Sequence, residues 1–168
     1  MVGRSLSELE HRVWVALRGV MDPEIPVVSV VDMGMIREVE VEDGVATVTV
    51  LPTFTGCPAI AVIRADVAAA VASVDGIENA VVELSFDPSW TTDRITKEGR
   101  RRLEEFGLAP PSGHAPVLIT DIGLPSAATC PFCGSRDTVN ENLFGPTPCR
   151  ALYYCNGCRN PFEQFKSV

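Results

Sequence analysis

The stretch IREVEVEDGVATVTV at residues 36–50 predicts a β-hairpin. Polar and apolar residues alternate on both sides of Asp43-Gly44, a dipeptide typical of two-residue hairpin turns. With these two residues as the turn, one face of the hairpin is apolar and the other is polar, which makes the register self-consistent. The predicted pairs are Glu42 with Val45, Val41 with Ala46, Glu40 with Thr47, Val39 with Val48 and Glu38 with Thr49.

Helices are predicted on either side of the hairpin. Ser7 and Glu10 have the spacing of a capping box, and the apolar residues after them recur at helical spacing until Asp22-Pro23 ends the helix. After the hairpin, Pro58 suits the first position of a second helix, which places Cys57 at or next to its N-cap. The apolar face of this second helix consists of Ile60, Ile63, Val67, Val71 and Val74.

A third strand and a third helix follow. The strand is predicted from alternating apolar residues and stops at Asp87-Pro88; these residues are Val82, Leu84 and Phe86. The helix is capped by Thr96 and closed by Gly107. Its predicted inward-facing residues are Leu103 and Phe106. The fold class is therefore α/β, of order α-β-β-α-β-α, with a small sheet and helices, followed by a small zinc-ribbon domain.

The zinc ribbon is predicted from two C-x2-C pairs near the end of the chain. Cys130 and Cys133 form the first pair, Cys155 and Cys158 form the second, and 21 residues separate the pairs. Each pair makes a tight knuckle that presents two sulfurs to one ion, as in structural four-thiolate zinc sites. A module of about 40 residues has too small a core to fold alone, so we expect zinc to supply much of its stability. An iron site and a redox dithiol stay open as alternatives.

Two cysteines lie outside these pairs. Cys149 precedes Cys155 by six positions, and a packed thiol beside the site is favoured over a ligand role. Cys57, near a helix N-terminus, would feel the positive end of the helix dipole, which favours a thiolate able to bind soft metal or to attack. A small buried hydrophobe at a helix cap explains Cys57 equally well. Asp22 and Glu24 are candidates to face the same loop, although exposed loop acids are the commoner explanation.

The composition is that of a globular protein. The chain has 168 residues, 46% of them hydrophobic and 21% charged, which allows one ordinary domain and a small one. No apolar run suits a membrane span, and Glu8 and Glu10 interrupt the stretch where a signal peptide would be apolar, so we expect a cytoplasmic protein without membrane contact. The net charge of -8 argues against nucleic-acid binding. The run Arg100-Arg101-Arg102 is interpreted as the solvated face of a helix.

The charge and composition divide the chain into modules. Residues 1–108 are predicted to form the α/β domain, residues 109–127 a linker and residues 128–168 the ribbon. The linker region is rich in proline and glycine and has a single charged residue, Asp121. Some of its residues are apolar enough to lie against a domain, namely Val117, Leu118, Ile119 and Ile122.

Several enzyme classes are excluded by their missing motifs. The only histidines are His11 and His114, so zinc enzymes of the H-E-x-x-H type lack their ligands. Glu8-x-x-His11 matches half of a di-iron carboxylate motif, and no second half is present. The sequence contains no G-x-S-x-G, no P-loop and no G-x-G-x-x-G, which argues against a hydrolase, an NTPase and a dinucleotide-dependent reductase.

Motifs in both modules resemble those of known families. DPEIP at 22–26, DMGM at 32–35, GCP at 56–58 and DPSWTTD at 87–93 resemble the domain shared by SufT-like iron-sulfur assembly factors. CPFC at 130–133, FGPTPCRALY at 144–153 and PFEQFK at 161–166 resemble the zinc ribbon of the PaaD family of bacterial phenylacetyl-CoA epoxidase systems. The resemblance spans nearly the whole chain, and the pairing of modules is far more specific than either half. The chain departs from the usual ribbon at Pro146 and Pro148, where small residues are common.

This resemblance implies an accessory protein rather than a catalyst that works alone. It implies membership of a multicomponent system that epoxidises the aromatic ring of phenylacetyl-CoA in aerobic phenylacetate degradation, with a di-iron oxygenase and a flavin and iron-sulfur reductase as the other subunits. The implied role is iron-sulfur or metal-centre assembly in one of those partner subunits. In related domains the cysteine that matches Cys57 is the proposed cluster or metal contact, and Asp22, Glu24 and Thr53 lie in the accompanying motifs. The implied cofactors are structural zinc and a transient iron-sulfur cluster or iron.

Two other functions stay open at this point. One is an interaction adaptor with a structural zinc ribbon, in which Cys57 only packs. The other is a thiol oxidoreductase, which requires a C-x2-C pair free of metal. The client subunit, the role of Cys149 and the formation of a homodimer are also open.

Overall fold

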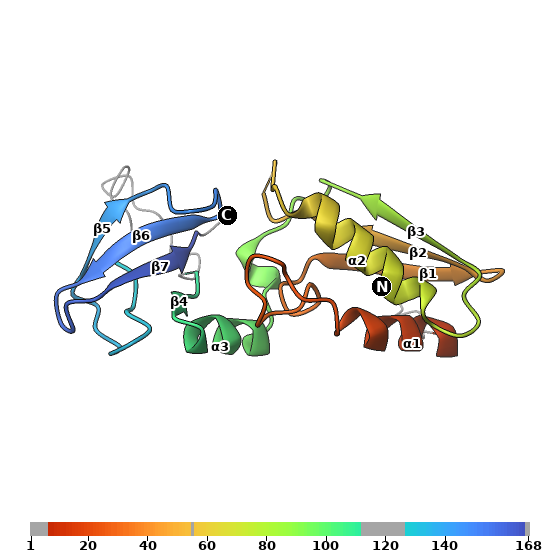
Figure 1. Ribbon diagram of the computed structural model, residues 1–168, viewed down its shortest axis with the longest axis horizontal. Coiled ribbons are helices and arrows are strands. Elements are labelled where there is room, and N and C mark those ends of the chain that lie inside the picture. The colour runs from red at the N-terminus through yellow and green to blue at the C-terminus, as the bar shows by residue number, and fades with distance from the viewer. Residues whose placement is uncertain (1–6, 55, 112–126, 167–168) are drawn as a thin grey trace. The chain divides into compact units, whose positions relative to one another are not determined.

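The computed structural model describes residues 7–54, 56–111 and 127–166. The chain divides into two compact units, Met1–Trp90 and Thr91–Val168, each with its own sheet (Figure 1). The third predicted helix lies in the second unit, and the domain limits 1–108, 109–127 and 128–168 remain a prediction. The apolar linker residues at 117–119 and 122 lie outside the described part of the chain. In that described part, no helix is long and apolar enough to cross a membrane.

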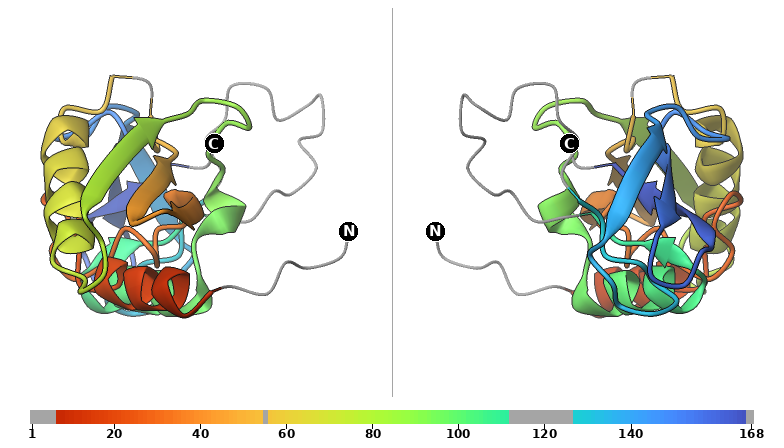
Figure 2. Two further views of the ribbon diagram at one scale, coloured as in Figure 1. Left: turned by 90° about the vertical axis from the view of Figure 1, so that its right-hand side faces the viewer. Right: turned by 90° about the vertical axis from the view of Figure 1, so that its left-hand side faces the viewer.

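The first unit is a three-stranded sheet with two helices. Its elements are α1 (Glu8–Leu17), β1 (Ile36–Glu42), β2 (Val45–Val50), α2 (Ile60–Ala72) and β3 (Asn79–Leu84). The strand order is β1-β2-β3, with β1 antiparallel to β2 and β2 parallel to β3, so α2 is the crossover between parallel strands. The helices contact each other, α1 also contacts β1 and α2 also contacts β3, which places both helices on one face of the sheet (Figure 2).

The predicted hairpin register is confirmed in all five pairs. Asp43 and Gly44 have φ values of 48° and 78°, and positive φ at both central residues is the requirement of a type I′ turn. Val39, Val48 and Val82 align across the three strands on the face that the helices cover, and all three are buried. The opposite face carries the exposed carboxylates of β1 and β3. The sheet is thus buried on one side only.

Three predictions about the ends of elements are wrong. Helix α2 begins at Ile60 with Ala59 as its N-cap, because the Cys57 carbonyl accepts a hydrogen bond from the Ile60 N–H at 3.3 Å and closes a separate turn first. Strand β3 ends at Leu84, so Phe86 lies beyond it and is 56% exposed. Helix α1 ends at Leu17, well before Asp22-Pro23. The capping box of α1, from Ser7 to Glu10, is confirmed.

The second unit is a four-stranded sheet preceded by a helix. Its elements are η1 (Thr92–Arg94), α3 (Lys97–Glu105), β4 (Leu108–Ala109), β5 (Thr138–Asn142), β6 (Arg150–Cys155) and β7 (Pro161–Phe165). The strand order is β4-β7-β6-β5; β4 is parallel to β7 and the other neighbours are antiparallel. Tyr153 and Phe162 stack in its core with ring centroids 5.6 Å apart. The short β4 adds residues just before and within the predicted linker to the ribbon sheet.

Helix α3 has the predicted caps and a different inward face. The Thr96 side chain accepts a hydrogen bond from the Gly99 N–H at 2.9 Å, and Gly107 follows the helix with φ 88°. Leu103 is buried as predicted, whereas Phe106 is 48% exposed, so its inward placement is wrong. Phe106 is the C-cap residue, where the side chain has already left the buried stripe of the helix.

The arginine run of α3 is engaged within the chain. Arg101 pairs with Glu98 and Glu105, and Arg102 pairs with Glu98 at 2.8 Å. The remaining guanidinium, that of Arg100, donates to the carbonyls of Thr92 and Pro111 at 2.7 and 3.0 Å. All three guanidinium groups thus bind groups of the chain itself, which favours the interpretation as a helix face over that as a phosphate site.

Candidate metal centre

Four cysteine thiols converge at one end of the ribbon sheet. The Sγ atoms of Cys130, Cys133, Cys155 and Cys158 all lie within 4.8 Å of one another. The short distances join the two pairs: 3.7 Å from Cys130 to Cys158 and 3.6 Å from Cys133 to Cys155. Residues more than 20 positions apart in the sequence therefore contribute to one cluster.

The two knuckles that present these thiols are built alike. In the first, the Gly134 N–H donates to the Cys130 carbonyl at 2.9 Å, and Gly134 has φ 72°. In the second, the Arg159 N–H donates to the Cys155 carbonyl at 2.8 Å, and Arg159 has φ 60°. A positive φ at the residue after each C-x2-C pair turns the chain back, which leaves both sulfurs of a pair on the same side of the knuckle.

The cluster has the size of a tetrahedral zinc site. Four ligands at about 2.3 Å from a central ion are about 3.8 Å apart, close to the two short sulfur distances. Cys130 and Cys155 are buried, Cys158 is half-buried and Cys133 is exposed. The Cys158 N–H also points at the Cys155 sulfur at 3.5 Å, a contact that stabilises a thiolate. These residues fit zinc with all four coordination positions filled by protein, the mark of a structural rather than a catalytic site.

Without metal, the thiols differ in acidity. Desolvation raises the pKa of Cys158, but hydrogen bonds from the Asn160 side chain and backbone outweigh it and lower that pKa to about 7. A backbone hydrogen bond from Ser135 lowers the pKa of Cys133, but partial desolvation and the neighbouring thiols outweigh it and raise that pKa to about 12. Burial likewise raises the pKa of Cys130. Zinc must therefore displace protons from the cluster when it binds.

Cys149 is not part of this cluster. It precedes β6 while Cys155 ends that strand, and six residues at about 3.3 Å each separate them by about 20 Å. Cys149 is buried, its Sγ lies 3.1 Å from the Thr147 hydroxyl, and its carbonyl accepts a hydrogen bond from the Lys166 N–H. Of the two interpretations of Cys149, these contacts favour a packed thiol over a metal ligand. This thiol lies at the far end of β6 and not beside the four-cysteine cluster.

Cys57 lies in the loop between β2 and α2 and is half-buried. Its N–H donates to the Phe54 carbonyl at 3.1 Å, two residues before the N-cap of α2. The effect of the helix dipole falls off with distance from the first turn, so it acts less on the Cys57 thiol than it would at the expected position at or next to the N-cap. Next to it, Gly56 has φ 84°, and a Cβ there would have no atom within 4 Å. The backbone beside Cys57 thus faces open space.

Asp22 is a buried turn residue and not an exposed loop acid. Its Oδ1 accepts hydrogen bonds from the N–H groups of Glu24 and Ile25 at 2.7 and 3.0 Å. Its own N–H donates to the Val28 carbonyl at 2.9 Å. The carboxylate therefore holds the turn that carries Glu24, which is half-buried.

The loops that carry Asp22 and Cys57 are joined by the backbone. The Leu51 N–H, just after β2, donates to the Met35 carbonyl at 2.7 Å, which ties the loop after α1 to the loop before α2. Thr53 follows Leu51 by two residues and is buried. The four thiols of the ribbon are thus gathered into one cluster, whereas the chain segments that carry Asp22 and Glu24 on one side and Thr53 and Cys57 on the other are linked by the hydrogen bond between Met35 and Leu51.

Trp90 is a positioning residue to which the sequence alone assigns no role. Its indole Nε1 donates to the Met33 carbonyl at 2.8 Å, and the side chain is 4% exposed. This bond connects the motif at 87–93 with the motif at 32–35. The sequence does contain a signal for this role, a tryptophan inside an otherwise polar motif, because a buried indole N–H needs a hydrogen-bond acceptor.

Two family models match the chain, one in each module. Residues 10–84 match the model described as iron-sulfur cluster assembly protein, and residues 115–166 match the PaaD zinc beta ribbon domain. The sequence is 39% identical over 158 residues to an Escherichia coli K12 protein named as one of the subunits of 1,2-phenylacetyl-CoA epoxidase, covering 94% of this chain and 93% of that protein. It is also 43% identical over 88 residues to an Fe-S protein maturation auxiliary factor of Porphyromonas gingivalis, covering 52% of this chain and 83% of that one.

Solved structures resemble the first module. A domain of unknown function, DUF59, from Bacillus anthracis matches with a TM-score of 0.53 and 27% identity, covering 56% of this chain and 91% of that one. A conserved hypothetical protein from Thermotoga maritima matches with a TM-score of 0.50 and 29% identity, and the match covers 61% of this chain and 98% of that one. The mixed α/β fold predicted for the first module is thus confirmed, and a four-cysteine cluster of zinc-ribbon type follows it.

Proposed function

The chain belongs to the PaaD family, and on this premise we propose that it is a non-catalytic accessory component of the phenylacetyl-CoA 1,2-epoxidase system in aerobic phenylacetate degradation. Its task is the assembly of an iron-sulfur cluster or another metal centre in a partner subunit, either the oxygenase or the reductase. The observation that carries this proposal is the presence, in one chain, of a domain similar to Fe-S maturation factors and a closed four-thiolate site.

The two modules have different tasks in this proposal. Zinc bound by Cys130, Cys133, Cys155 and Cys158 holds the two knuckles of the ribbon together, and the folded ribbon docks onto the partner. The Cys57 thiol is the soft ligand that contacts the cluster or iron in transit. Asp22, Glu24 and Thr53 supply oxygen atoms around it, with Asp22 also holding the turn described above.

The chain alone is expected to have no epoxidase activity. A zinc ion with four protein ligands has no open position for oxygen or substrate. Glu8 and His11, the only half of a di-iron motif in the sequence, are both exposed on α1. Turnover of phenylacetyl-CoA by the purified chain without the other subunits would contradict the non-catalytic assignment.

The test of assembly is the Cys57→Ala variant, with Val62→Ala on the exposed side of α2 as its control. Cys57 is half-buried and Val62 is exposed, so both changes should leave the fold and partner binding intact. We expect the partner subunit produced with Cys57→Ala to contain less iron or sulfide, and that produced with Val62→Ala to be fully loaded. Elemental analysis of the anaerobically purified partner measures this. Full loading with both variants would contradict a transfer role for Cys57.

The Asp22→Asn variant tests whether the negative charge of Asp22 has a role beyond the hydrogen bonds that hold its turn. The amide keeps an oxygen that can accept from the Glu24 and Ile25 N–H groups, so the turn should persist. A lower iron content of the partner with this variant would show that the negative charge is needed for transfer. A normal iron content would indicate that Asp22 only stabilises the turn and that its charge has no part in transfer.

An interaction adaptor is the second candidate, because α2 starts at Ile60 and leaves Cys57 outside the helix N-terminus. In that case Cys57→Ala would leave both the metal content and the activity of the epoxidase unchanged while the ribbon still bound its partner. The thiol oxidoreductase requires a metal-free C-x2-C pair. One zinc per chain in anaerobically purified protein would exclude it.

A further inference from the structure

The loop between β5 and β6 exposes an aromatic ring. Phe144 is 74% exposed, and Leu143 beside it is 54% exposed. Exposed apolar residues that stand singly are common in soluble proteins. An exposed phenylalanine next to a second apolar residue is less common, and phenylalanine is among the aromatic residues that are enriched in the cores of protein interfaces. The proposed function, which assigns docking to the ribbon, leaves this pair unexplained.

This loop, Leu143–Cys149, is held in one conformation by its own contacts. The Phe144 N–H donates to Asn142 Oδ1 at 2.9 Å, and the Gly145 N–H donates to the Arg150 carbonyl at 2.9 Å. A Cβ on Gly145 would lie 3.0 Å from that carbonyl oxygen, so a larger residue would have to push the backbone at Arg150 away. Pro146 and Pro148 fix two further φ angles. The ring is therefore presented by an ordered loop, which lowers the entropy cost of binding.

A positive charge lies directly beside the ring. The Lys166 ammonium is 5.0 Å from the centroid of the Phe144 ring and donates a hydrogen bond to the Pro148 carbonyl at 2.8 Å. The contact orders the lysine and keeps its charge next to the aromatic face. Ring and charge thus form one feature, which a partner would match with an apolar pocket that has carboxylates at its rim.

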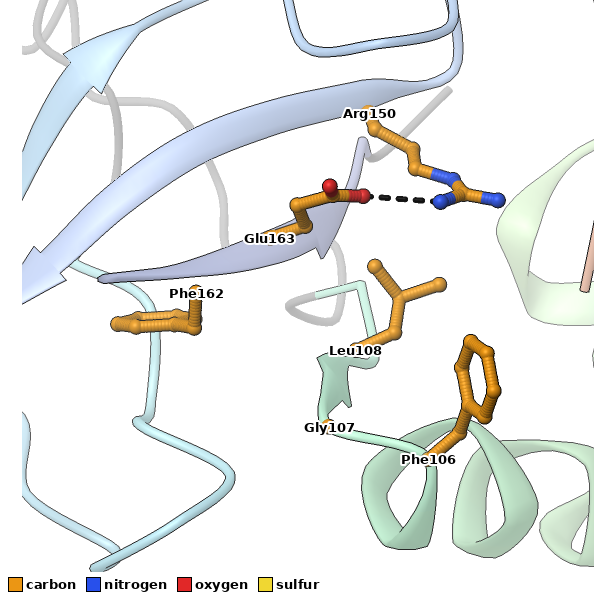
Figure 3. Close-up of a pocket in the computed structure, with 6 residues that line it drawn as sticks. All are labelled: Phe106, Gly107, Leu108, Arg150, Phe162 and Glu163. Atoms are coloured by element: carbon orange, nitrogen blue, oxygen red, sulfur yellow. Dashed lines mark hydrogen bonds and ion pairs between the residues drawn. The ribbon is translucent and has the colours of Figure 1, made fainter. Parts of the chain in front are cut away.

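The ion pair next to the loop adds no net charge beside Lys166. Arg150, which follows the loop, pairs with Glu163 at 2.9 Å above a cleft of about 240 Å³ (Figure 3). The cleft is lined by Phe106, Gly107, Leu108, Arg150, Phe162 and Glu163. The four-thiolate zinc site, with a formal charge of -2, lies at the other end of β6. The length of that strand, about 17 Å, exceeds the screening length of about 8 Å at physiological ionic strength.

We infer that Leu143–Cys149 is the docking loop of the ribbon: it inserts Phe144 into an apolar, acid-rimmed pocket of the oxygenase or reductase subunit that receives the metal centre. The inference rests on the proposed function for the identity of that partner. The choice of an acidic rim follows from charge complementarity with Lys166. The first unit has a large excess of acidic residues and would repel an acidic partner surface. We therefore expect such a surface to bind the ribbon and not the first unit.

The experiment compares Phe144→Ala with Phe86→Ala in the full-length, zinc-loaded protein. Both rings are exposed, so both variants should fold and keep their zinc, and Phe86 lies in the first unit. The probes are the purified oxygenase and reductase subunits, and titration calorimetry measures the affinity. We expect Phe144→Ala to weaken binding to one of these subunits tenfold or more, and Phe86→Ala to leave it within twofold of the native value.

Charge is tested with Lys166→Glu, and Lys166→Arg is its control. Lys166→Glu should weaken binding at low salt, with a difference that shrinks as salt is added, because screening removes the interaction with the acidic rim. Lys166→Arg keeps the charge over the ring and should bind as the native protein does. Equal effects of both variants would contradict the acidic rim.

Three results would overturn the docking loop. If Phe144→Ala binds as tightly as the native chain while Cys158→Ala does not bind, the ribbon docks elsewhere, and the proposed function stands. If sedimentation shows a dimer that Phe144→Ala abolishes, the occupant of the loop is a second copy of this chain. If the native protein binds neither subunit, the docking loop and the docking step of the proposed function fail together.

Discussion

Trp90 stabilises the first unit through a single polar atom. Its indole is buried, and its N–H donates to the carbonyl of Met33, a residue of the loop after α1. Because Met35 in that loop in turn accepts from Leu51, the chain around residue 90 is connected to the Cys57 loop by two successive hydrogen bonds. A side chain that carries no chemistry of its own thus links the 87–93 motif to the loop between α1 and β1.

Trp90→Phe should destabilise the first unit by about 1–3 kcal/mol, because it leaves the buried Met33 carbonyl without its donor. Urea unfolding followed by circular dichroism measures the change. Trp14→Phe on α1 is the control, since Trp14 is only half-buried and a similar loss of ring size costs less there. Equal losses for the two variants would assign the effect to ring volume and not to the hydrogen bond.

At the scale of elements, the surface of α3 provides a test of charge. Hydrogen bonds from Arg101 and Arg102 lower the pKa of Glu98 to about 2, against a usual value of 4.5. A carboxylate whose pKa is lower in the folded state stabilises that state at pH above about 4.5, and this contribution is lost as the pH falls toward 2. The side chains are solvated, so the contribution is small.

Glu98→Gln should therefore speed amide exchange in α3 at neutral pH, and the difference from the native protein should shrink as the pH falls from about 4.5 toward 2. Hydrogen exchange resolved by NMR measures this. Glu104→Gln on the same helix is the matched control, because Glu104 is exposed. A Glu98→Gln effect that stays constant over that pH range would show that the carboxylate charge is not its source.

The hairpin and the start of α2 show what the sequence predicts well and what it misses. The register around Asp43-Gly44 is local: two residues determine the turn, and alternation determines the faces. The start of α2 depends on competition between a helix turn and the turn closed by Cys57 and Ile60, and Pro58 suits both. Sequence preference alone does not decide between two turns of nearly equal geometry.

Burial was mispredicted where coverage by another element decides it. Periodicity indicates which side chains share a face, and it placed Phe106 on the inward face of α3 and Phe86 in β3. Both are exposed, because Phe106 is the C-cap that follows the last residue of its helix and Phe86 lies beyond its strand. The same limit applies to the candidate site: C-x2-C spacing predicted the thiol cluster, whereas the hydrogen bond from Leu51 to Met35, which links the two loops, depends on tertiary structure.

At the scale of the molecule, the two units differ in what stabilises them. The first has a core between sheet and helices, while the second has the four-cysteine cluster beside a small core around Tyr153 and Phe162. Removing zinc with a chelator should therefore unfold the ribbon and leave the first unit folded. Limited proteolysis with mass spectrometry should show cuts after Thr91 and protection before it. Cys158→Ala should give the same pattern, and loss of protection in the first unit at equal chelator would contradict it.

The division at Trp90 also separates the two natural chromophores. Both tryptophans, Trp14 and Trp90, belong to the first unit, and both tyrosines, Tyr153 and Tyr154, belong to the second. Light at the long-wavelength edge of aromatic absorption excites indole alone and reports on the first unit, while the phenol signal reports on the second. The chain thus carries a separate optical probe for each half, and the loss of either structure can be followed against the other without an added label.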